Sequence, residues 1–284
     1  MRPIKRSVLF FVLIVFILSS LPAFGANLGL GLVKQELLFG RVFKRPFEPI
    51  SPRFEWFNEK VAYNLQSWLV DRMIKMRDAK VIGYKVAFTS PPSQKKFGTN
   101  EPAYGVLLDY MELKDNTQID HTKIMKSFVE VEVGFRFAKD IVKPVKDTEE
   151  LQRYVDGAFP AVELPAIRFT TLKGVKAADI IADDAGTSYF ISGKVVDLNT
   201  VDLGEIVGTL SKDGEVVRDG NSKAVLGSPW NALLWVVNKI IDMGGVIKEG
   251  DIVITGTMTP LYPLAPGKYS VTYGKLGNIS FIVK

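Results

Sequence analysis

Apolar and polar residues alternate strictly over residues 128–135, which read Phe-Val-Glu-Val-Glu-Val-Gly-Phe. A period of two places the three valines on one face of a strand and the two glutamates, Glu130 and Glu132, on the other. Side chains two apart on one strand face lie roughly 6–7 Å from each other, so two carboxylates repel unless water or a cation screens them. The pair therefore indicates either an ordinary solvated strand face or half of a site for a hard metal ion.

The same patterns predict a chain rich in strands. Apolar side chains recur every three or four positions over residues 54–77 and again over residues 230–243, which end at Gly244-Gly245, and both stretches predict amphipathic helices. A helical turn is expected over residues 93–97 and a two-residue hairpin turn at Asp213-Gly214. Strands are predicted over residues 81–89, 128–137, 161–169, 189–192, 205–212, 215–218, 252–255, 269–273 and 279–283. We therefore expect a β-dominated α+β domain with helices at its front and one late helix.

The start of the chain predicts a targeting segment rather than part of the fold. Three basic residues precede an unbroken apolar run over residues 8–18, and small residues around Gly25 fit cleavage by signal peptidase after that position. The run is short for a membrane span, which needs about 20 residues. We expect a secretory signal over residues 1–25 and an exported protein, periplasmic or extracellular, with an uncleaved membrane anchor as the alternative.

The rest of the chain is organised simply. Glycines and prolines predict an irregular N-terminal arm over residues 26–53. Residues 54–284 follow without a repeat and are enough for one large domain with a full core.

Composition excludes several classes of protein. The net charge is +5, but three basic residues and no acidic ones belong to the targeting segment, so the remainder gives no reason to expect nucleic acid, or a membrane once the signal is removed. The chain has no cysteine, which excludes disulfides, thiol catalysis, thiolate metal sites and a lipoprotein anchor.

Common catalytic motifs are also absent. His121 is the only histidine and has no Gly-x-Ser-x-Gly elbow to match it, so we interpret it as a loop residue. No phosphate-binding or dinucleotide-binding glycine motif occurs. Without histidine or cysteine ligands, the remaining option for a metal is an oxygen-ligand site that suits Mg²⁺ or Mn²⁺.

Two charged residues interrupt apolar runs. Glu163 lies in a short apolar stretch bounded by Pro160 and Pro165, so its carboxylate is either at an exposed strand end or neutralised by a cation. Lys85 lies in the apolar stretch 81–88, where a lysine is either an edge residue with a solvated ammonium group or a catalytic group.

Seven short motifs follow one another along the chain. They are Gly-Tyr-Lys-Val-Ala-Phe-Thr-Ser (83–90), Glu-Pro-Ala-Tyr-Gly-Val-Leu (101–107), Val-Glu-Val-Glu-Val-Gly-Phe (129–135), Pro-Ala-Val-Glu-Leu (160–164), Ile-Ala-Asp-Asp-Ala (181–185), Leu-Gly-Ser-Pro-Trp-Asn-Ala (226–232) and Gly-Asp-Ile-Val-Ile-Thr-Gly-Thr (250–257). In this order they resemble the 2-keto-4-pentenoate hydratase family, within the fumarylacetoacetase C-terminal-domain superfamily. The resemblance covers roughly residues 55 to 284 and implies that superfamily's mixed β-roll or sandwich.

The resemblance also implies a metal site. Glu130, Glu132 and Glu163 match the family's ligands for Mg²⁺ or Mn²⁺, and the substrate, a small 2-hydroxy-2,4-dienoate or its keto form, chelates the metal through its carboxylate and the adjacent oxygen. Three carboxylates offset the charge of the cation, which polarises the 2-oxo oxygen.

Further roles follow from the resemblance alone. Lys85 matches the family's active-site lysine, and Asp184, which stands where asparagine is common, is a second candidate catalytic residue. Family members commonly form homo-oligomers. The candidate substrate-binding residues are Thr89, Ser90, Tyr104 and Thr257.

One position departs from the family pattern. Hydrating members usually carry an acidic residue where this chain has Ala103, and alanine cannot relay a proton. Glu101, Asp109, Asp184 or water are possible replacements, or hydratase activity is lost. The predicted export signal is a second departure, because relatives of this type act in the cytoplasm.

Three functions are therefore open. The first is a metal-dependent lyase that hydrates or decarboxylates a small 2-oxo acid, since both reactions pass through a dienolate. The second is an exported, non-catalytic protein that binds metal and keto acids. The third is an acylpyruvate hydrolase, which is less favoured because His121 has no carboxylate three residues on.

Overall fold

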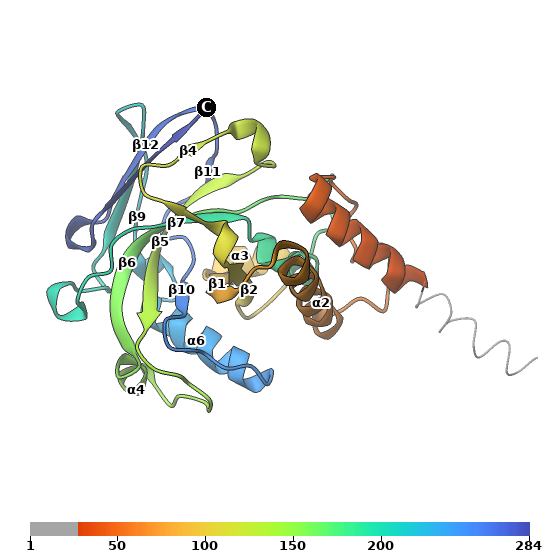
Figure 1. The fold of residues 1–284 in the computed structure, drawn as a ribbon, viewed down its shortest axis with the longest axis horizontal. Coiled ribbons are helices and arrows are strands. Elements are labelled where there is room, and N and C mark those ends of the chain that lie inside the picture. Colours follow the sequence, from red (N-terminus) through yellow and green to blue (C-terminus); the bar gives the residue numbers. More distant parts are fainter. Residues whose placement is uncertain (1–27) are drawn as a thin grey trace, which may run out of the picture.

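The computed structural model describes residues 28–284, so the predicted signal segment lies outside the described residues. In that part of the chain, two sheets form a curled body with helices at one end and along its lower side (Figure 1). The predicted strand-rich α+β fold is confirmed. None of the helices described is both long and apolar enough to cross a bilayer.

Eight strands form the larger sheet: β1 (Val81–Ala87), β2 (Ala103–Leu108), β3 (Glu112–Lys114), β5 (Phe128–Phe137), β6 (Val155–Leu164), β7 (Tyr189–Ser192), β10 (Ile252–Ile254) and β11 (Tyr262–Pro263). Their order is β2-β1-β10-β5-β6-β7-β3, with β11 paired to β5. β1 is parallel to β10 and β3 to β7, while the other pairs are antiparallel. Strands β10, β5 and β6 therefore lie in the middle of this sheet, and β1 lies between β10 and the edge strand β2.

The smaller sheet holds β4 (Gln118–Ile119), β8 (Val207–Lys212), β9 (Glu215–Asn221), β12 (Gly267–Thr272) and β13 (Asn278–Val283), in the order β4-β13-β12-β8-β9. The hairpin predicted at Asp213-Gly214 joins β8 to β9, and both turn residues have positive φ. The two sheets meet closely at Gly208, where a Cβ would lie 2.8 Å from Val131 of β5. The valine face of β5 therefore packs toward the smaller sheet.

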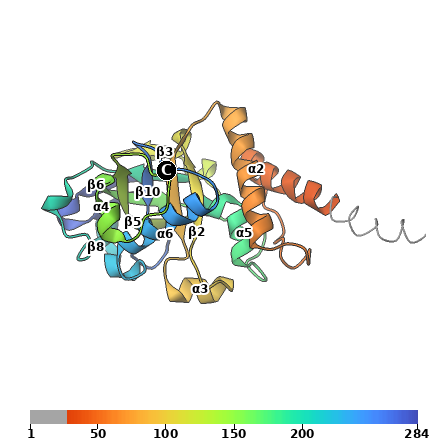
Figure 2. The same ribbon diagram turned by 90° about the horizontal axis from the view of Figure 1, so that it is seen from below.

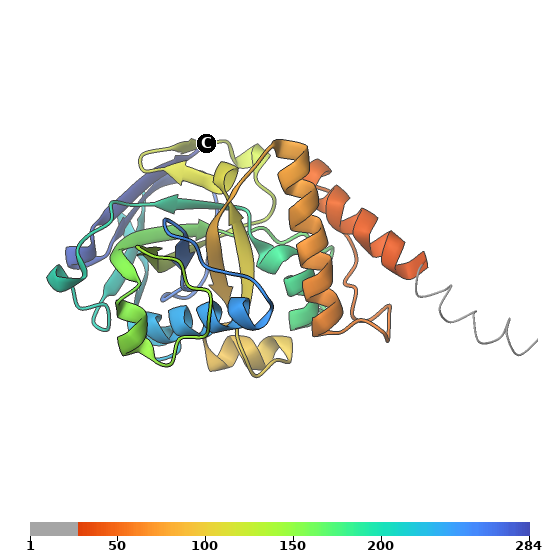
Figure 3. The same ribbon diagram turned by 60° about the horizontal axis from the view of Figure 1, so that its bottom comes forward.

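The described helices are α2 (Glu59–Arg77), α3 (Pro91–Phe97), α4 (Thr148–Gln152), α5 (Ala177–Ala182) and α6 (Pro229–Asp242), besides an N-terminal helix over residues 28–43. Asn58 caps α2, which ends at the left-handed residue Asp78. Helix α2 packs against α5, and α6 against α4 and β1 (Figure 3). The helices thus cover one end and the lower side of the larger sheet.

The expectation of an irregular arm is wrong for residues 28–43, which are helical. Val33 and Leu37, four residues apart, are fully buried, so this N-terminal helix belongs to the core. Beyond it, Asp179 of α5 accepts backbone N–H bonds from Ile50 and Ser51, at 2.5 and 2.9 Å. The N-terminal helix and the segment that follows it therefore both contact the rest of the domain.

Other element boundaries also differ from the sequence-based expectation. The strand expected over residues 161–169 occupies Val155–Leu164 and ends just before Pro165. Strand β2, over Ala103–Leu108, was not predicted. By contrast, β5 occupies the predicted residues 128–137.

Candidate metal centre and active site

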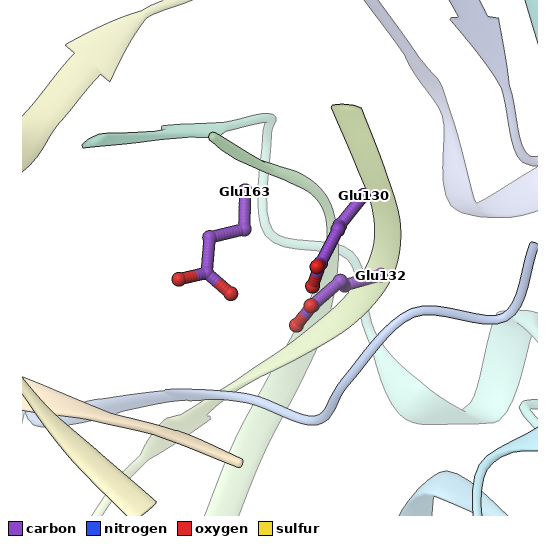
Figure 4. A group of neighbouring side chains, drawn as sticks. All are labelled: Glu130, Glu132 and Glu163. Atoms are coloured by element: carbon purple, nitrogen blue, oxygen red, sulfur yellow. The ribbon is translucent and has the colours of Figure 1, made fainter. Parts of the chain in front are cut away.

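Three glutamates meet on one face of the β5–β6 ladder. Glu130 of β5 lies directly opposite Glu163 of β6, and Glu132 lies opposite Ala161, whose small side chain leaves space beside it. One carboxylate oxygen from each glutamate lies within 4.8 Å of the others (Figure 4). Glu132 and Glu163 are 0% and 1% exposed. The solvated-face interpretation is therefore wrong, and so is an exposed strand end for Glu163.

The hydrogen-bond pattern of these carboxylates fits a cation. Glu132 Oε2 accepts the N–H of Gly256 at 2.8 Å, while Glu132 Oε1 and Glu163 Oε1 are buried without a hydrogen-bond partner. Buried carboxylate oxygens without partners are costly. A cluster of hard oxygen donors suits Mg²⁺ or Mn²⁺. The three glutamates therefore fit the predicted metal.

Burial shifts the protonation of the same groups. Loss of hydration raises the pKa of Glu130, raises that of Glu132 well above its ordinary value, and raises that of Glu163 to about 7. Mutual repulsion adds to the shift of Glu132, and Lys85 opposes all three shifts. Without a cation, the cluster therefore retains protons at pH values where ordinary glutamates are charged.

Lys85 lies beside the cluster. It belongs to β1, between β2 and β10, and is 3% exposed, so the edge-residue interpretation is wrong. Its Nζ is 3.0 Å from Glu163 Oε2. Burial alone would lower the pKa of Lys85, but the charges of the neighbouring glutamates, Glu163 foremost, raise it overall. Lys85 is therefore an ammonium group placed where a bound oxyanion can contact it.

A cavity of about 680 Å³ lies beside this cluster. Lys85 and Glu130 line one part of it, together with three of the four predicted substrate-binding residues, Thr89, Ser90 and Thr257. Gly256 must be glycine here, because its φ is +99° and a Cβ would lie 2.3 Å from Thr89 Oγ1. The structure thus brings the metal centre, the lysine and these three residues together around one space.

Tyr104 does not line this cavity. Tyr104 pairs with Val86, whereas Lys85 pairs with Gly105, so Tyr104 and Lys85 lie on opposite faces of the sheet. The Tyr104 hydroxyl donates instead to Met243 Sδ at 3.4 Å. A substrate contact by Tyr104 therefore finds no support in the geometry.

Asp184 also lies outside the cavity lining. Its Oδ1 accepts the N–H of Val106 at 2.7 Å, and its Oδ2 lies 3.3 Å from Arg41. Burial raises the pKa of Asp184 to about 6, with Arg41 opposing the shift. A catalytic role for Asp184 remains a prediction from the sequence, while the observed contacts are structural.

Sequence reasoning missed the buried charges behind Asp184. Arg41, from the N-terminal helix, donates to the carbonyl oxygens of Asp183 and Thr187, both at 2.7 Å, and Arg168 pairs with the Asp183 carboxylate at 3.0 Å. These bonds hold residues 184–186, which have three successive positive φ values, and Ala185 and Gly186 of this turn line the cavity. No local sequence pattern signals pairing between positions so far apart.

Ala103 lies on the same face as Lys85, opposite Ala87. An acidic side chain there would adjoin the lysine. The proposed replacements are engaged elsewhere, because Glu101 pairs with Lys239 at 3.0 Å and Asp109 accepts the N–H of Lys80 at 3.2 Å. Neither lines the cavity. Lys85 therefore has no carboxylate from these positions beside it.

Comparison with known proteins agrees with this geometry. The family described as Fumarylacetoacetate (FAA) hydrolase C-terminal matches residues 108–283. The chain is 31% identical over 221 residues to 4-oxalocrotonate decarboxylase of Pseudomonas putida, covering 77% of this chain and 83% of that protein. It is 28% identical over 243 residues to 2-keto-4-pentenoate hydratase 2 of Dechloromonas aromatica, covering 83% and 90%.

A solved structure shares the fold over most of its length. 4-Oxalocrotonate decarboxylase from Pseudomonas putida G7, complexed with magnesium and adipate, matches with a TM-score of 0.85 and 26% identity, covering 91% of this chain and 98% of that one. The resemblance inferred from the seven motifs is confirmed. The chain belongs to the fumarylacetoacetate hydrolase C-terminal family.

Proposed function

We propose that the protein is a divalent-metal-dependent lyase that acts on a small 2-oxo-3-enoic or 2-hydroxy-2,4-dienoic acid. The observation that carries the proposal is the pairing of Glu130, Glu132 and Glu163 with a buried Lys85 at one part of the cavity. The relatives named as hydratases and decarboxylases support the same class of reaction.

Each group has a distinct task. The three glutamates would hold the cation, which when bound supplies a Lewis acid that polarises the 2-oxo group. Lys85 places its ammonium beside Glu163, where it stabilises negative charge developing on the substrate oxygen and exchanges a proton with it. The apolar remainder of the cavity limits access of water to the dienolate.

Decarboxylation is the reaction that this residue set supports best. Among the described residues that line the cavity, the ionisable ones are Lys85, Glu130 and Lys96. When a 2-oxo-3-enedioic acid loses its remote carboxylate, the electron pair of the broken carbon–carbon bond moves through the double bond onto the 2-oxygen, so no base is needed at the remote end. Hydration must also activate a water and protonate a remote carbon. Ala103 supplies no group for that step.

The purified protein is expected to release CO₂ from 2-oxohex-3-enedioate in the presence of Mg²⁺ or Mn²⁺, and chelator should stop the reaction. Slower hydration of 2-hydroxypenta-2,4-dienoate is expected, and Ala103→Asp should raise it by about 10-fold or more by restoring an acid beside Lys85. Loss of dienol absorbance measures hydration.

Ala103→Asn is the matched control, because it adds the same bulk without a titratable group. Consumption of neither acid by protein that binds metal would contradict the lyase and favour the non-catalytic keto-acid-binding alternative. Equal gains from Ala103→Asp and Ala103→Asn would contradict the proton-transfer explanation.

We also propose that the protein is exported and forms a homo-oligomer. The basic start and apolar run of the N-terminal segment support export. Leu28, Leu32 and Phe43 of the N-terminal helix recur at helical spacing and are 63%, 47% and 63% exposed, and this apolar stripe supports burial against another copy. Cell fractionation with mass spectrometry of the N-terminus tests export, which a cytoplasmic chain with an intact Met1 would contradict. Light scattering tests the oligomer, which a monomer would contradict.

A further inference from the structure

We propose that the natural substrate carries a large apolar group, an aromatic ring or a branched hydrocarbon, as a substituent on the carbon chain beyond its 2-oxo acid, in addition to the carboxylate that is released as CO₂. This inference rests on the proposed function, because it names the substrate class of the same site. It concerns the part of the cavity that the metal centre and Lys85 leave unused.

The size of the cavity is the first observation. Its volume of about 680 Å³ lies well inside the range of roughly 300–1,000 Å³ that holds drug-sized ligands. A five-carbon or six-carbon acid bound at the glutamates fills only a small part of that space. The remaining volume is therefore available to a substituent.

The β5–β6 ladder shows in which direction this space extends. Phe128 lies two residues before Glu130 on the same strand face, on the side away from Glu132. Next along the ladder, Ser127 bridges Ala166, and the N–H of Ile167 donates to the carbonyl of Lys126 at 2.8 Å. Phe128, Ala166 and Ile167 line the cavity. The residues that line the cavity are therefore apolar directly beside the glutamate cluster, at the next positions along the β5–β6 ladder.

The facing walls are also apolar. The segment after β1 and helix α3, which projects at the bottom of Figure 2, contributes Phe88 and Phe97, whose ring centroids are 5.2 Å apart. Phe169 and Leu172, which come after the end of β6 in the sequence, also line the cavity. Aromatic side chains on several sides favour a flat or bulky hydrocarbon group.

Most polar side chains on these walls are already engaged. The Ser90 hydroxyl donates to Ser93 Oγ at 3.1 Å, and Ser93 Oγ donates to the Ser90 carbonyl at 2.7 Å. The Thr257 hydroxyl donates to the carbonyl of Thr259 at 3.1 Å. These hydroxyls are therefore committed to local contacts and do not select a polar substituent.

Lys96 is the only cation besides Lys85 among the described lining residues. It is exposed on α3, and its ammonium lies 5.2 Å from the ring centroid of Phe97. An ammonium that remains in water gains little from pairing with a substrate carboxylate. A remote carboxylate recognised by Lys96 is therefore the competing outcome of the test.

Binding of 2-oxo-4-phenylbut-3-enoate, 2-oxohexanedioate and 2-oxobutanoate to the magnesium-loaded protein distinguishes these outcomes by calorimetry, and the saturated diacid is used because it lacks the double bond through which CO₂ is lost. The phenyl acid is expected to bind roughly 30-fold more tightly than 2-oxobutanoate, with a more negative heat-capacity change, because burying the ring removes apolar surface from water. Phe169→Ala should remove most of this preference and leave 2-oxobutanoate binding unchanged.

Two further variants keep the test decisive. Leu172→Ala, at a half-exposed position, should reduce the preference even if Phe169→Ala fails to fold, and Val216→Ala, exposed on β9, should not. Tighter binding of 2-oxohexanedioate, lost in Lys96→Met, would overturn the apolar substituent and leave the lyase standing. Failure of the metal-loaded protein to bind any of the three acids would overturn both.

Discussion

Glu132→Gln is expected to abolish turnover while making the metal-free protein more stable at pH 8. The variant removes one of three carboxylates from a cluster in which Glu132 Oε1 and Glu163 Oε1 are buried without a hydrogen-bond partner. A bound cation stabilises developing charge by several kcal/mol, so we expect kcat/KM to fall by about 10³-fold or more and Mg²⁺ affinity to fall with it. The glutamine carbonyl can still accept the N–H of Gly256, so local geometry is retained.

The stability gain follows from the shifted pKa of Glu132. Burial raises this pKa well above the unfolded value, so the metal-free folded state holds a proton that the unfolded state releases. Stability therefore falls as pH rises from the unfolded value through the folded one. Glutamine avoids this loss, so the advantage of the variant should be present at pH 8 and shrink toward pH 5.

Thermal unfolding in chelator at pH 5 and pH 8, together with calorimetric Mg²⁺ binding, checks both effects. Glu215→Gln, at the exposed start of β9, is the control and should change neither. A Glu132→Gln variant that retains wild-type turnover would exclude the metal centre. A variant that is less stable at pH 8 would show that the Glu132 carboxylate is stabilised rather than penalised in the metal-free fold.

Lys85→Met is expected to lower kcat by about 10²- to 10⁴-fold while leaving metal binding intact or tighter. The side chains have similar length, but methionine has no ammonium to stabilise or protonate the substrate oxygen. Removing the positive charge 3.0 Å from Glu163 makes the cluster more attractive to a cation. A fall in kcat together with unchanged or tighter metal binding would distinguish a catalytic lysine from a merely structural one.

Removing one partner of a buried ion pair also destabilises the metal-free protein, so activity is best measured in saturating Mg²⁺. Lys75→Met, which changes a lysine exposed on α2 and outside the cavity lining, is the matched control and should retain kcat toward 2-oxohex-3-enedioate. A kcat of Lys85→Met close to that of the wild type would show that Lys85 only offsets the negative charge of the glutamates.

Local pattern singled out the three glutamates that the structure brings together. Strict alternation defined β5 and the shared face of Glu130 and Glu132, and the lone charge in an apolar run singled out Glu163. Both features follow from which residues of a single strand are buried, and that pattern is visible in a short stretch of sequence.

The remaining features depend on register and distance. Tyr104 belongs to a recognised motif, but the pairing of Lys85 with Gly105 turns it to the other face of the sheet. Arg41 donates hydrogen bonds to residues more than 140 positions away in the chain. The helix that carries it was not predicted, because its glycines indicated an irregular arm. Such contacts follow from tertiary packing and leave no local periodicity.

The division of the site along the chain has an evolutionary consequence. The three glutamates proposed to hold the metal lie within residues 108–283, the stretch that matches the family, whereas Lys85, the N-terminal helix and α3 precede it. Substitutions in the first part of the chain can therefore alter proton transfer and substrate shape while the cation cage is inherited unchanged. One fold can therefore host different reactions while it keeps the same metal site.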